Sequence, residues 1–190
     1  MKAPIFRLIL PALLLTLEAC NGSQFEYSDR SCYVLFDNAT HLDPTIASAM
    51  TPYSNVFVTI SETIHGGARY FRFASNQGGA STESIFNAID QRHSIIIGMN
   101  GGLIVGYGAL SDPLTFYAFD RECPNCFDPA RLPVRGYPLQ TASNGIATCA
   151  TCKRQYDLNN MGIIVAGDPG NKLTRYRAET TGPHGVLFVH

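Results

Sequence analysis

Four of the six cysteines in this chain fall into two Cys-x-x-Cys pairs, and this pattern constrains the fold more than any other feature. Cys123 and Cys126 form the first pair, and Cys149 and Cys152 form the second after a gap of 22 residues. A strand-like run precedes each pair, so the sequence predicts two neighbouring turns that carry thiols at their tips. Structural zinc sites use spacings close to this one, and we expect a metal site at these four residues.

The N-terminus has the form of a processing segment. Lys2 and Arg7 make a short basic region, and an apolar run follows over residues 8–17. Ten residues cannot cross a hydrocarbon core of roughly 30 Å, so the run is typical of a signal peptide and not of an anchor helix. Residues 17–20 read Leu-Glu-Ala-Cys and resemble the bacterial lipobox, in which cleavage precedes a diacylated cysteine. The resemblance implies a signal peptide over residues 1–19 and a lipid on Cys20.

Composition narrows the class of protein. Removing residues 1–19 changes the formal net charge only from −1 to −2, because Lys2, Arg7 and Glu18 leave together. There is no basic excess to suggest nucleic acid and no second long apolar segment. The chain has 17 glycines, 11 prolines, no tryptophan and 20 tyrosines and phenylalanines, which favours strands and turns over helices. We therefore expect a tether over residues 20–31 and one mostly β domain over residues 32–190.

Local patterns predict the elements of that domain. One short helix is expected over residues 45–50, because Asp43-Pro44 supplies a cap and a first-turn proline. A second is expected over residues 81–90, where Ile85, Phe86 and Ile89 have helical spacing. A hairpin is expected to pair residues 94–99 with 103–107 across Asn100-Gly101-Gly102. Further strands are expected at residues 32–36, 56–60, 70–73, 114–119, 137–140, 145–148, 173–178 and 186–189.

The order of these pieces resembles a Rieske ferredoxin domain from about Ser94 to His190. The resemblance is carried by a strand ending in Ala118-Phe119-Asp120 before Cys123-Pro124, by Cys149-x-x-Cys152 followed by Tyr156-Asp157-Leu158, and by Leu173-x-x-Tyr176 before a closing strand. With the lipobox, the layout is similar to Rieske-like lipoproteins of Bacteroidota. The resemblance implies an antiparallel β sandwich with a small cysteine-bearing subdomain at about residues 120–168.

The chain departs from the Rieske pattern at both histidine ligands. Asn125 stands at the first histidine position, with Cys126 next to it, and Cys152 stands at the second. Four thiolates around a 2Fe–2S core leave more negative charge than two thiolates and two imidazoles. All-cysteine clusters accordingly have potentials near about −400 mV, against roughly −150 to +300 mV for Rieske centres. The fold can follow from the resemblance, but a histidine-ligated cluster cannot.

Three uses of the four thiols remain open from the sequence. The first is a metal site holding zinc, iron or an all-cysteine 2Fe–2S cluster, with electron transfer as its function if iron is bound. The second is a structural or interaction lipoprotein in which the same cysteines form disulfides. The third is a redox dithiol, which needs a helix at the Cys-x-x-Cys that the sequence does not supply. Cys32 is left over and is expected to be a small buried hydrophobe.

No nucleophile–base pair or cofactor loop can be read from the chain, so we expect no enzyme activity of its own. Asp120 and Asp157 flank the cysteine loops and are expected to fix turns. The lipobox implies a cell-envelope protein attached through Cys20 to the outer membrane. The membrane face, the protein partner and the metal are not determined by the sequence.

Overall fold

The computed structural model describes residues 26–190, and the expected signal peptide and Cys20 lie outside the described residues. The described part is mostly β, with three antiparallel sheets and two short helices. Its elements in chain order are β1 (Val34–Asp37), α2 (Asn38–His41), α3 (Pro44–Ala49), β2 (Phe57–His65), β3 (Ala68–Ser75), β4 (Thr82–Ile85), the 3₁₀ turn η2 (Asp90–Arg92), β5 (Gly102–Gly108), β6 (Thr115–Asp120), β7 (Leu139–Thr141), β8 (Ile146–Cys149), β9 (Gln155–Asp157), β10 (Ile163–Ala166), β11 (Arg175–Tyr176), β12 (Ala178–Thr180) and β13 (Val186–Val189).

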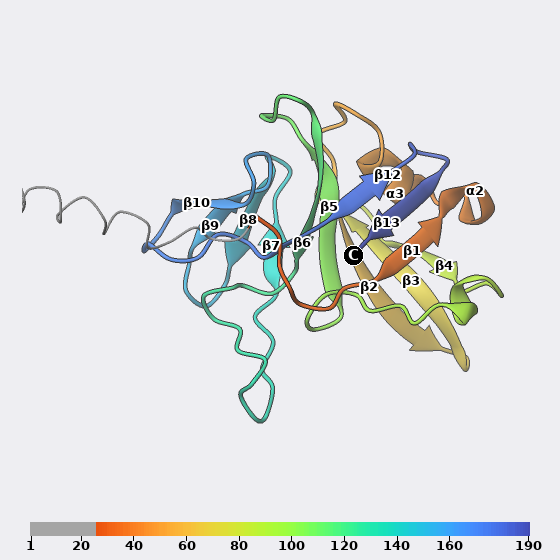
Figure 1. The fold of residues 1–190 in the computed structure, drawn as a ribbon, viewed down its shortest axis with the longest axis horizontal. Helices are drawn as coiled ribbons and strands as arrows, with labels where there is room; N and C mark the ends of the chain where they lie inside the picture. The colour runs from red at the N-terminus through yellow and green to blue at the C-terminus, as the bar shows by residue number, and fades with distance from the viewer. Residues whose placement is uncertain (1–25) are drawn as a thin grey trace, which may run out of the picture.

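The largest sheet has six strands in the order β11-β6-β5-β2-β3-β4. A three-stranded sheet, β1-β13-β12, lies on one side of it together with the two helices (Figure 1). A four-stranded sheet, β10-β9-β8-β7, lies on the other side, and its strands fall within the expected cysteine subdomain. The six-stranded sheet is therefore the middle layer of the molecule.

Two hydrophobic cores lie on opposite faces of this middle sheet. Alternate residues of β5 divide between them, with Leu103 and Val105 in the first core and Ile104 in the second. β6 divides in the same way, because Ala118 faces the first core while Phe119 faces the second. Successive side chains of a strand point to opposite faces, so a strand covered on both sides is apolar at consecutive positions.

The first short helix confirms the cap read from the sequence. Asp43 precedes α3, and its Oδ1 accepts hydrogen bonds from the backbone N–H groups of Thr45 (2.9 Å) and Ile46 (3.1 Å). Pro44 occupies the first turn, where the missing N–H is not needed. Ile46 and Ala49 are buried and carry the helix onto the first core. Cys32 is also buried in that core, as expected.

The helix expected over residues 81–90 is wrong. Residues 82–85 form β4, which pairs with β3, and only the 3₁₀ turn η2 follows. Burial alternates with a period of two, since Ser84 and Phe86 are buried while Ile85 is 52% exposed. The spacing of Ile85, Phe86 and Ile89 is compatible with a helix. Residues 82–85 instead form backbone hydrogen bonds with the free edge of β3.

The expected hairpin between residues 94–99 and 103–107 is also wrong. β5 forms from the second half, but its two edges are occupied by β2 and β6. The first half is left with one isolated bridge, in which Ile96 and Tyr33 exchange backbone hydrogen bonds of 2.8 and 2.9 Å. A strand has two edges, so longer-range partners displaced the local one. The turn at Asn100-Gly101 remains, with Gly101 at φ 74°.

The strand expected over residues 173–178 is divided between two sheets. Arg175 and Tyr176 form β11 on the edge of the six-stranded sheet, and Ala178 begins β12 beside β13. The break falls at Arg177, whose backbone exchanges hydrogen bonds with His190. β9 and β10, together with β4, are strands that were not expected from the sequence. Within residues 26–190, no helix has the length and hydropathy needed to cross a membrane.

One ion pair on the middle sheet gives a modest prediction. Arg69 donates two hydrogen bonds to the Glu62 carboxylate, at 2.8 and 2.7 Å, and its guanidinium lies over the Phe86 ring. The bonds from Arg69 lower the pKa of Glu62 below 4.5, so the stabilisation is present above that pH and is lost as the pH falls through the lowered pKa. We expect Glu62→Gln to cost about 0.5 kcal/mol at neutral pH, because the pair is partly exposed.

Urea unfolding at neutral and acidic pH measures this effect. The difference between the wild type and Glu62→Gln should vanish once the pH lies below the lowered pKa. Glu179→Gln, at an exposed position of β12, is the control and should change little at either pH. A difference that persists in acid would show that the amide disturbs packing instead of removing an ion pair.

Candidate metal centre

The four cysteines of the two pairs come from different layers of the molecule. Cys123 and Cys126 lie in the turn that follows β6 of the middle sheet, and Cys149 is the last residue of β8 in the small sheet. Cys152 follows in the turn that leads to β9. Cys123 and Cys149 are 0% and 1% exposed within the second core, whereas Cys126 and Cys152 are half-buried at its edge.

The four sulfurs converge on one point. All four Sγ atoms lie within 4.8 Å of one another. Cys123 Sγ is 3.7 Å from Cys152 Sγ, and Cys149 Sγ is 3.8 Å from Cys126 Sγ, so each of these contacts joins the two loops. Four sulfurs at about 2.3 Å from a central zinc ion form a tetrahedron with edges of about 3.8 Å. The structure thus brings together all four residues that the sequence singled out, in an arrangement compatible with a metal ion.

Disulfides do not join these sulfurs. The five cysteines of residues 26–190 are all free thiols, and separations of 3.7 and 3.8 Å far exceed a sulfur–sulfur bond of about 2.0 Å. The described part of the structure therefore does not contain the disulfides of the second alternative. The redox-dithiol alternative also lacks its helix, because β9 follows Cys152 and no described helix follows Cys126.

Both Cys-x-x-Cys turns are closed by backbone hydrogen bonds to the first cysteine of the pair. The Cys123 carbonyl accepts from the N–H groups of Cys126 (3.1 Å) and Phe127 (2.9 Å). The Cys149 carbonyl accepts from Lys153 N–H at 3.0 Å. Metal-binding turns usually have glycine after the second cysteine, but here Phe127 and Lys153 occupy those positions. Lys153 supplies the left-handed conformation instead, with φ 61°.

This left-handed lysine gives a prediction of increased stability. A non-glycine residue at positive φ costs roughly 1 kcal/mol relative to glycine. We expect Lys153→Gly to raise the free energy of unfolding by about 0.5 kcal/mol, since the flexible unfolded chain offsets part of the gain. Lys153→Gln is the matched control, because it removes the charge and keeps the backbone cost. Chemical unfolding of both variants separates the two effects, and a loss of stability in Lys153→Gly alone would contradict this reading.

The surroundings shift the pKa values of the thiols in different directions. Burial raises the pKa of the Cys123 thiol, although the Tyr156 side chain and the backbone N–H of Asn125 act to lower it. The Tyr156 hydroxyl lies 3.2 Å from Cys123 Sγ. Burial raises the pKa of Cys126 as well. Burial also acts to raise the pKa of the Cys152 thiol, but the backbone and side chain of Arg154 and the neighbouring thiols of Cys126 and Cys149 together outweigh it and lower the pKa to about 6. Arg154 is thus the basic residue near the cysteines that lowers the pKa of one of the four thiols.

A third loop, residues 167–171, is held against both cysteine turns. Asn125, within the first cysteine turn, donates to Asn171 O (2.8 Å) and accepts from Asn171 N–H (2.9 Å). Arg154 donates to the carbonyls of Asp168 (2.9 Å) and Pro169 (3.1 Å). Its Gly-Asp-Pro-Gly run is a turn signal in the sequence, but nothing local indicates that this turn contacts the cysteine loops.

The two flanking carboxylates fix turns, as expected. Asp120 is fully buried and accepts from Met99 N–H (2.7 Å), Glu122 N–H (2.8 Å) and the Tyr176 hydroxyl (2.8 Å). Asp157 Oδ1 accepts from Asn159 N–H at 2.9 Å. Asp120 thus holds the end of β6 in place immediately before Cys123. Neither carboxylate belongs to the four-sulfur cluster, and no described histidine does.

Comparisons of this chain with protein-family models, curated proteins and solved structures gave no match. The family resemblance noted in the sequence therefore remains a prediction. The four-sulfur cluster stands on its own geometry.

Proposed function

We propose that Cys123, Cys126, Cys149 and Cys152 hold a single metal ion in tetrahedral coordination, and that this ion is zinc. The supporting observation is the mutual distance of the four sulfurs, at most 4.8 Å, with cross-loop contacts of 3.7 and 3.8 Å. In a 2Fe–2S core each iron directs its two thiolates away from the other iron. Sulfurs on different irons then lie clearly further apart than sulfurs on one metal, so the compact cluster favours one ion.

The proposed role of the ion is structural. Protein sulfurs fill all four tetrahedral positions, so no position is open for water or a substrate. The ion would join the end of β6 to the turn between β8 and β9, and so attach the small sheet to the middle sheet. The neighbouring residues have supporting parts in this scheme: the Tyr156 hydroxyl, 3.2 Å from Cys123 Sγ, would donate to the metal-bound thiolate, and Asn125 and Arg154 hold the third loop.

Electron transfer by a single iron is the second candidate function. The observation that favours it is the half-buried state of Cys126 and Cys152, which leaves one edge of the cluster near the surface. An electron-transfer centre needs such an edge, whereas a purely structural site does not. Four-sulfur tetrahedral sites accept either zinc or iron, so the metal itself distinguishes the two functions.

Metal content and the visible spectrum of anaerobically purified protein test these proposals. We expect one zinc per chain and no colour. One iron per chain with a rubredoxin-like spectrum would establish the second candidate instead. Two irons and two sulfides per chain would overturn the single-ion site. Alkylation after chelation and denaturation, without reductant, should modify all four thiols, and modification that needs a reductant would restore the disulfide alternative.

We further propose that the chain is an outer-membrane lipoprotein with a Rieske-like domain that has lost its histidine ligands. The support is the Leu-Glu-Ala-Cys run at residues 17–20 and the strand–cysteine order from Asp120 to Tyr176. Fatty-acid labelling of the wild type and of Cys20→Ala tests the anchor. Label on the wild type alone is expected, and label that survives in the variant would contradict the assignment of Cys20.

A further inference from the structure

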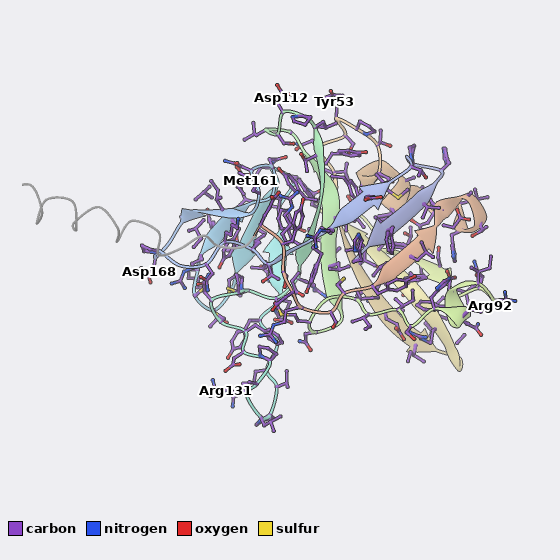
Figure 2. The ribbon with its side chains drawn as sticks, in the orientation of Figure 1. Tyr53, Arg92, Asp112, Arg131, Met161 and Asp168 are labelled. Carbon is purple, nitrogen blue, oxygen red and sulfur yellow. The ribbon has the colours of Figure 1, made fainter. Side chains whose placement is uncertain are left out.

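A loop of nine residues, 128–136, projects from the metal centre into solvent. Every residue of the loop is exposed. Figures 1 and 2 show it extending away from the three sheets, with Arg131 near its tip. Two hydrogen bonds hold its base, because Cys123 N–H donates to Tyr137 O at 3.0 Å and the Glu122 carboxylate accepts from Tyr137 N–H. The loop thus projects from a hydrogen-bonded base at the first cysteine pair.

The tip of this loop combines apolar and cationic side chains. Leu132 is 85% exposed and Val134 is 48% exposed, and Arg131 and Arg135 flank them. A single exposed leucine is ordinary on a protein surface. Two apolar residues between two arginines on a projecting tip match the boundary of an anionic bilayer, where apolar groups enter the acyl region and guanidinium groups remain at the phosphates.

The N-terminal segment lies at the same end of the molecule as the base of the loop. Glu26, the first described residue, and Pro129 line one open hollow of about 970 Å³. The segment is held there, because Arg175 donates to Glu26 Oε1 at 3.1 Å and Arg175 O accepts from Ser28 N–H at 2.7 Å. Six Cα–Cα steps separate Glu26 from Cys20, a reach of about 20 Å when fully extended. A lipid on Cys20 would keep this end of the molecule close to the bilayer.

The charges around the loop favour an anionic surface. The loop itself carries one aspartate, Asp128, against two arginines. The hollow at its base adds Arg30, Lys172 and Arg177 against Glu26 and Asp29, and Glu26 is already paired with Arg175. Positive charge therefore exceeds negative charge on this side. Each exposed cation near a bilayer is attracted by anionic lipid within about 10 Å of the surface.

From the projecting tip, the position of Glu26 near the base of the loop and the excess of positive charge, we propose that residues 131–135 dip into the surface of an anionic lipid bilayer and orient the domain on its membrane. The inference rests on the lipid anchor at Cys20 that is part of the proposed function. It makes the membrane a specific docking partner of the loop and not merely the place where the chain is tethered.

The absence of tryptophan from the chain allows a direct test. The mature protein, lipidated at Cys20, is reconstituted into vesicles of phosphatidylglycerol and phosphatidylcholine, with and without brominated acyl chains. Leu132→Trp places a single fluorophore at the tip. Tyr53→Trp is the matched control, because Tyr53 is 83% exposed and lies at the opposite end of the molecule from Arg131 in Figure 2.

We expect the tryptophan at position 132 to emit at shorter wavelength in vesicles and to lose most of its emission to brominated lipid. The tryptophan at position 53 should do neither. Adding Arg131→Gln and Arg135→Gln to Leu132→Trp should reduce the quenching, as should raising the salt concentration. A position-132 fluorophore that remains in water, as it would on a loop that binds a protein, overturns the proposal, and so does equal quenching at both positions.

Two further measurements on the same preparation separate the possible failures. If Cys20 carries fatty acid and position 132 is unquenched, the anchor stands and the loop proposal is wrong. If Cys20 carries no fatty acid, the anchor fails and the loop proposal fails with it. The metal content of the same sample reports on the four-cysteine site independently of either result.

Discussion

Replacing Cys149 with serine should abolish metal binding and lower the free energy of unfolding by about 4 kcal/mol or more. Loss of a structural metal is one of the few single changes with an effect this large, since the binding free energy of the ion is part of the folding free energy. Cys149 is 1% exposed and joins the end of β8 to the cluster, so the effect combines a lost ligand with a buried hydroxyl. Elemental analysis measures the loss of metal, and urea unfolding measures the loss of stability.

Cys32→Ala is the control for the loss of a buried thiol. Cys32 is 7% exposed in the first core and is not one of the four clustered cysteines that the described residues bring together. Its replacement should leave the metal content unchanged and cost about 1 kcal/mol, the price of a small cavity. A chelator should lower the melting temperature of the wild type and of Cys32→Ala, and leave that of Cys149→Ser unchanged. If Cys149→Ser keeps its metal, or is as stable as Cys32→Ala, the proposed site is wrong.

Replacing Asp120 with alanine should cost about 3–5 kcal/mol. Asp120 is fully buried and accepts three hydrogen bonds, from Met99 N–H, Glu122 N–H and the Tyr176 hydroxyl. Each buried donor left without a partner costs about 1–3 kcal/mol, and a cavity adds to the loss. Because these bonds join the end of β6 to two other segments just before Cys123, weaker metal binding should accompany the instability. Denaturant unfolding and metal titration test both.

Two variants that each remove one hydrogen bond give a scale for the stability loss of Asp120→Ala. Tyr176→Phe removes one of the three bonds and should cost about 1–2 kcal/mol. Asp157→Ala removes the single bond to Asn159 beside the other cysteine turn, and should also cost about 1 kcal/mol. Asp120→Ala should exceed both clearly. An Asp120→Ala protein as stable as Asp157→Ala would show that the buried network is not a principal support of the site.

The contribution of Asp120 to the free energy of unfolding depends on pH, and its raised pKa sets the direction. Burial raises its pKa above 3.8, and the three hydrogen bonds only partly oppose that shift. The folded protein therefore binds the proton at a higher pH than the unfolded chain does. The contribution of Asp120 to the free energy of unfolding falls as the pH rises from 3.8 through the raised pKa. The cost of Asp120→Ala should accordingly be greatest below this interval and smaller above it.

Several elements were predictable because their signals are local. The cap at Asp43 and the proline after it act within one turn, and α3 begins where they predict. β6, β8 and β13 overlap the strands expected at residues 114–119, 145–148 and 186–189, because each contains consecutive apolar residues. The two Cys-x-x-Cys turns belong to the same class, since each is closed by hydrogen bonds within five residues.

Other elements were decided by partners far away in the chain. Residues 82–85 became β4 because the edge of β3 was open. Residues 94–99 lost their expected partner because β2 and β6 occupied both edges of β5. The run over 173–178 was divided because its two halves pair with strands of different sheets. Hydrophobic periodicity reports which side chains are buried, but it does not report which backbone edge is free.

The candidate site divides in the same way. The sequence by itself determined which four residues supply sulfur, because Cys-x-x-Cys spacing is a local property of each turn. Only the tertiary structure decided that the two turns, from different sheets, place all four sulfurs within 4.8 Å as free thiols. It also added Tyr156 beside Cys123 and the loop at 167–171, which Asn125 and Arg154 hold in place. The reason is physical: a tetrahedral site depends on distances across the fold, and those are set by how the small sheet packs on the middle sheet.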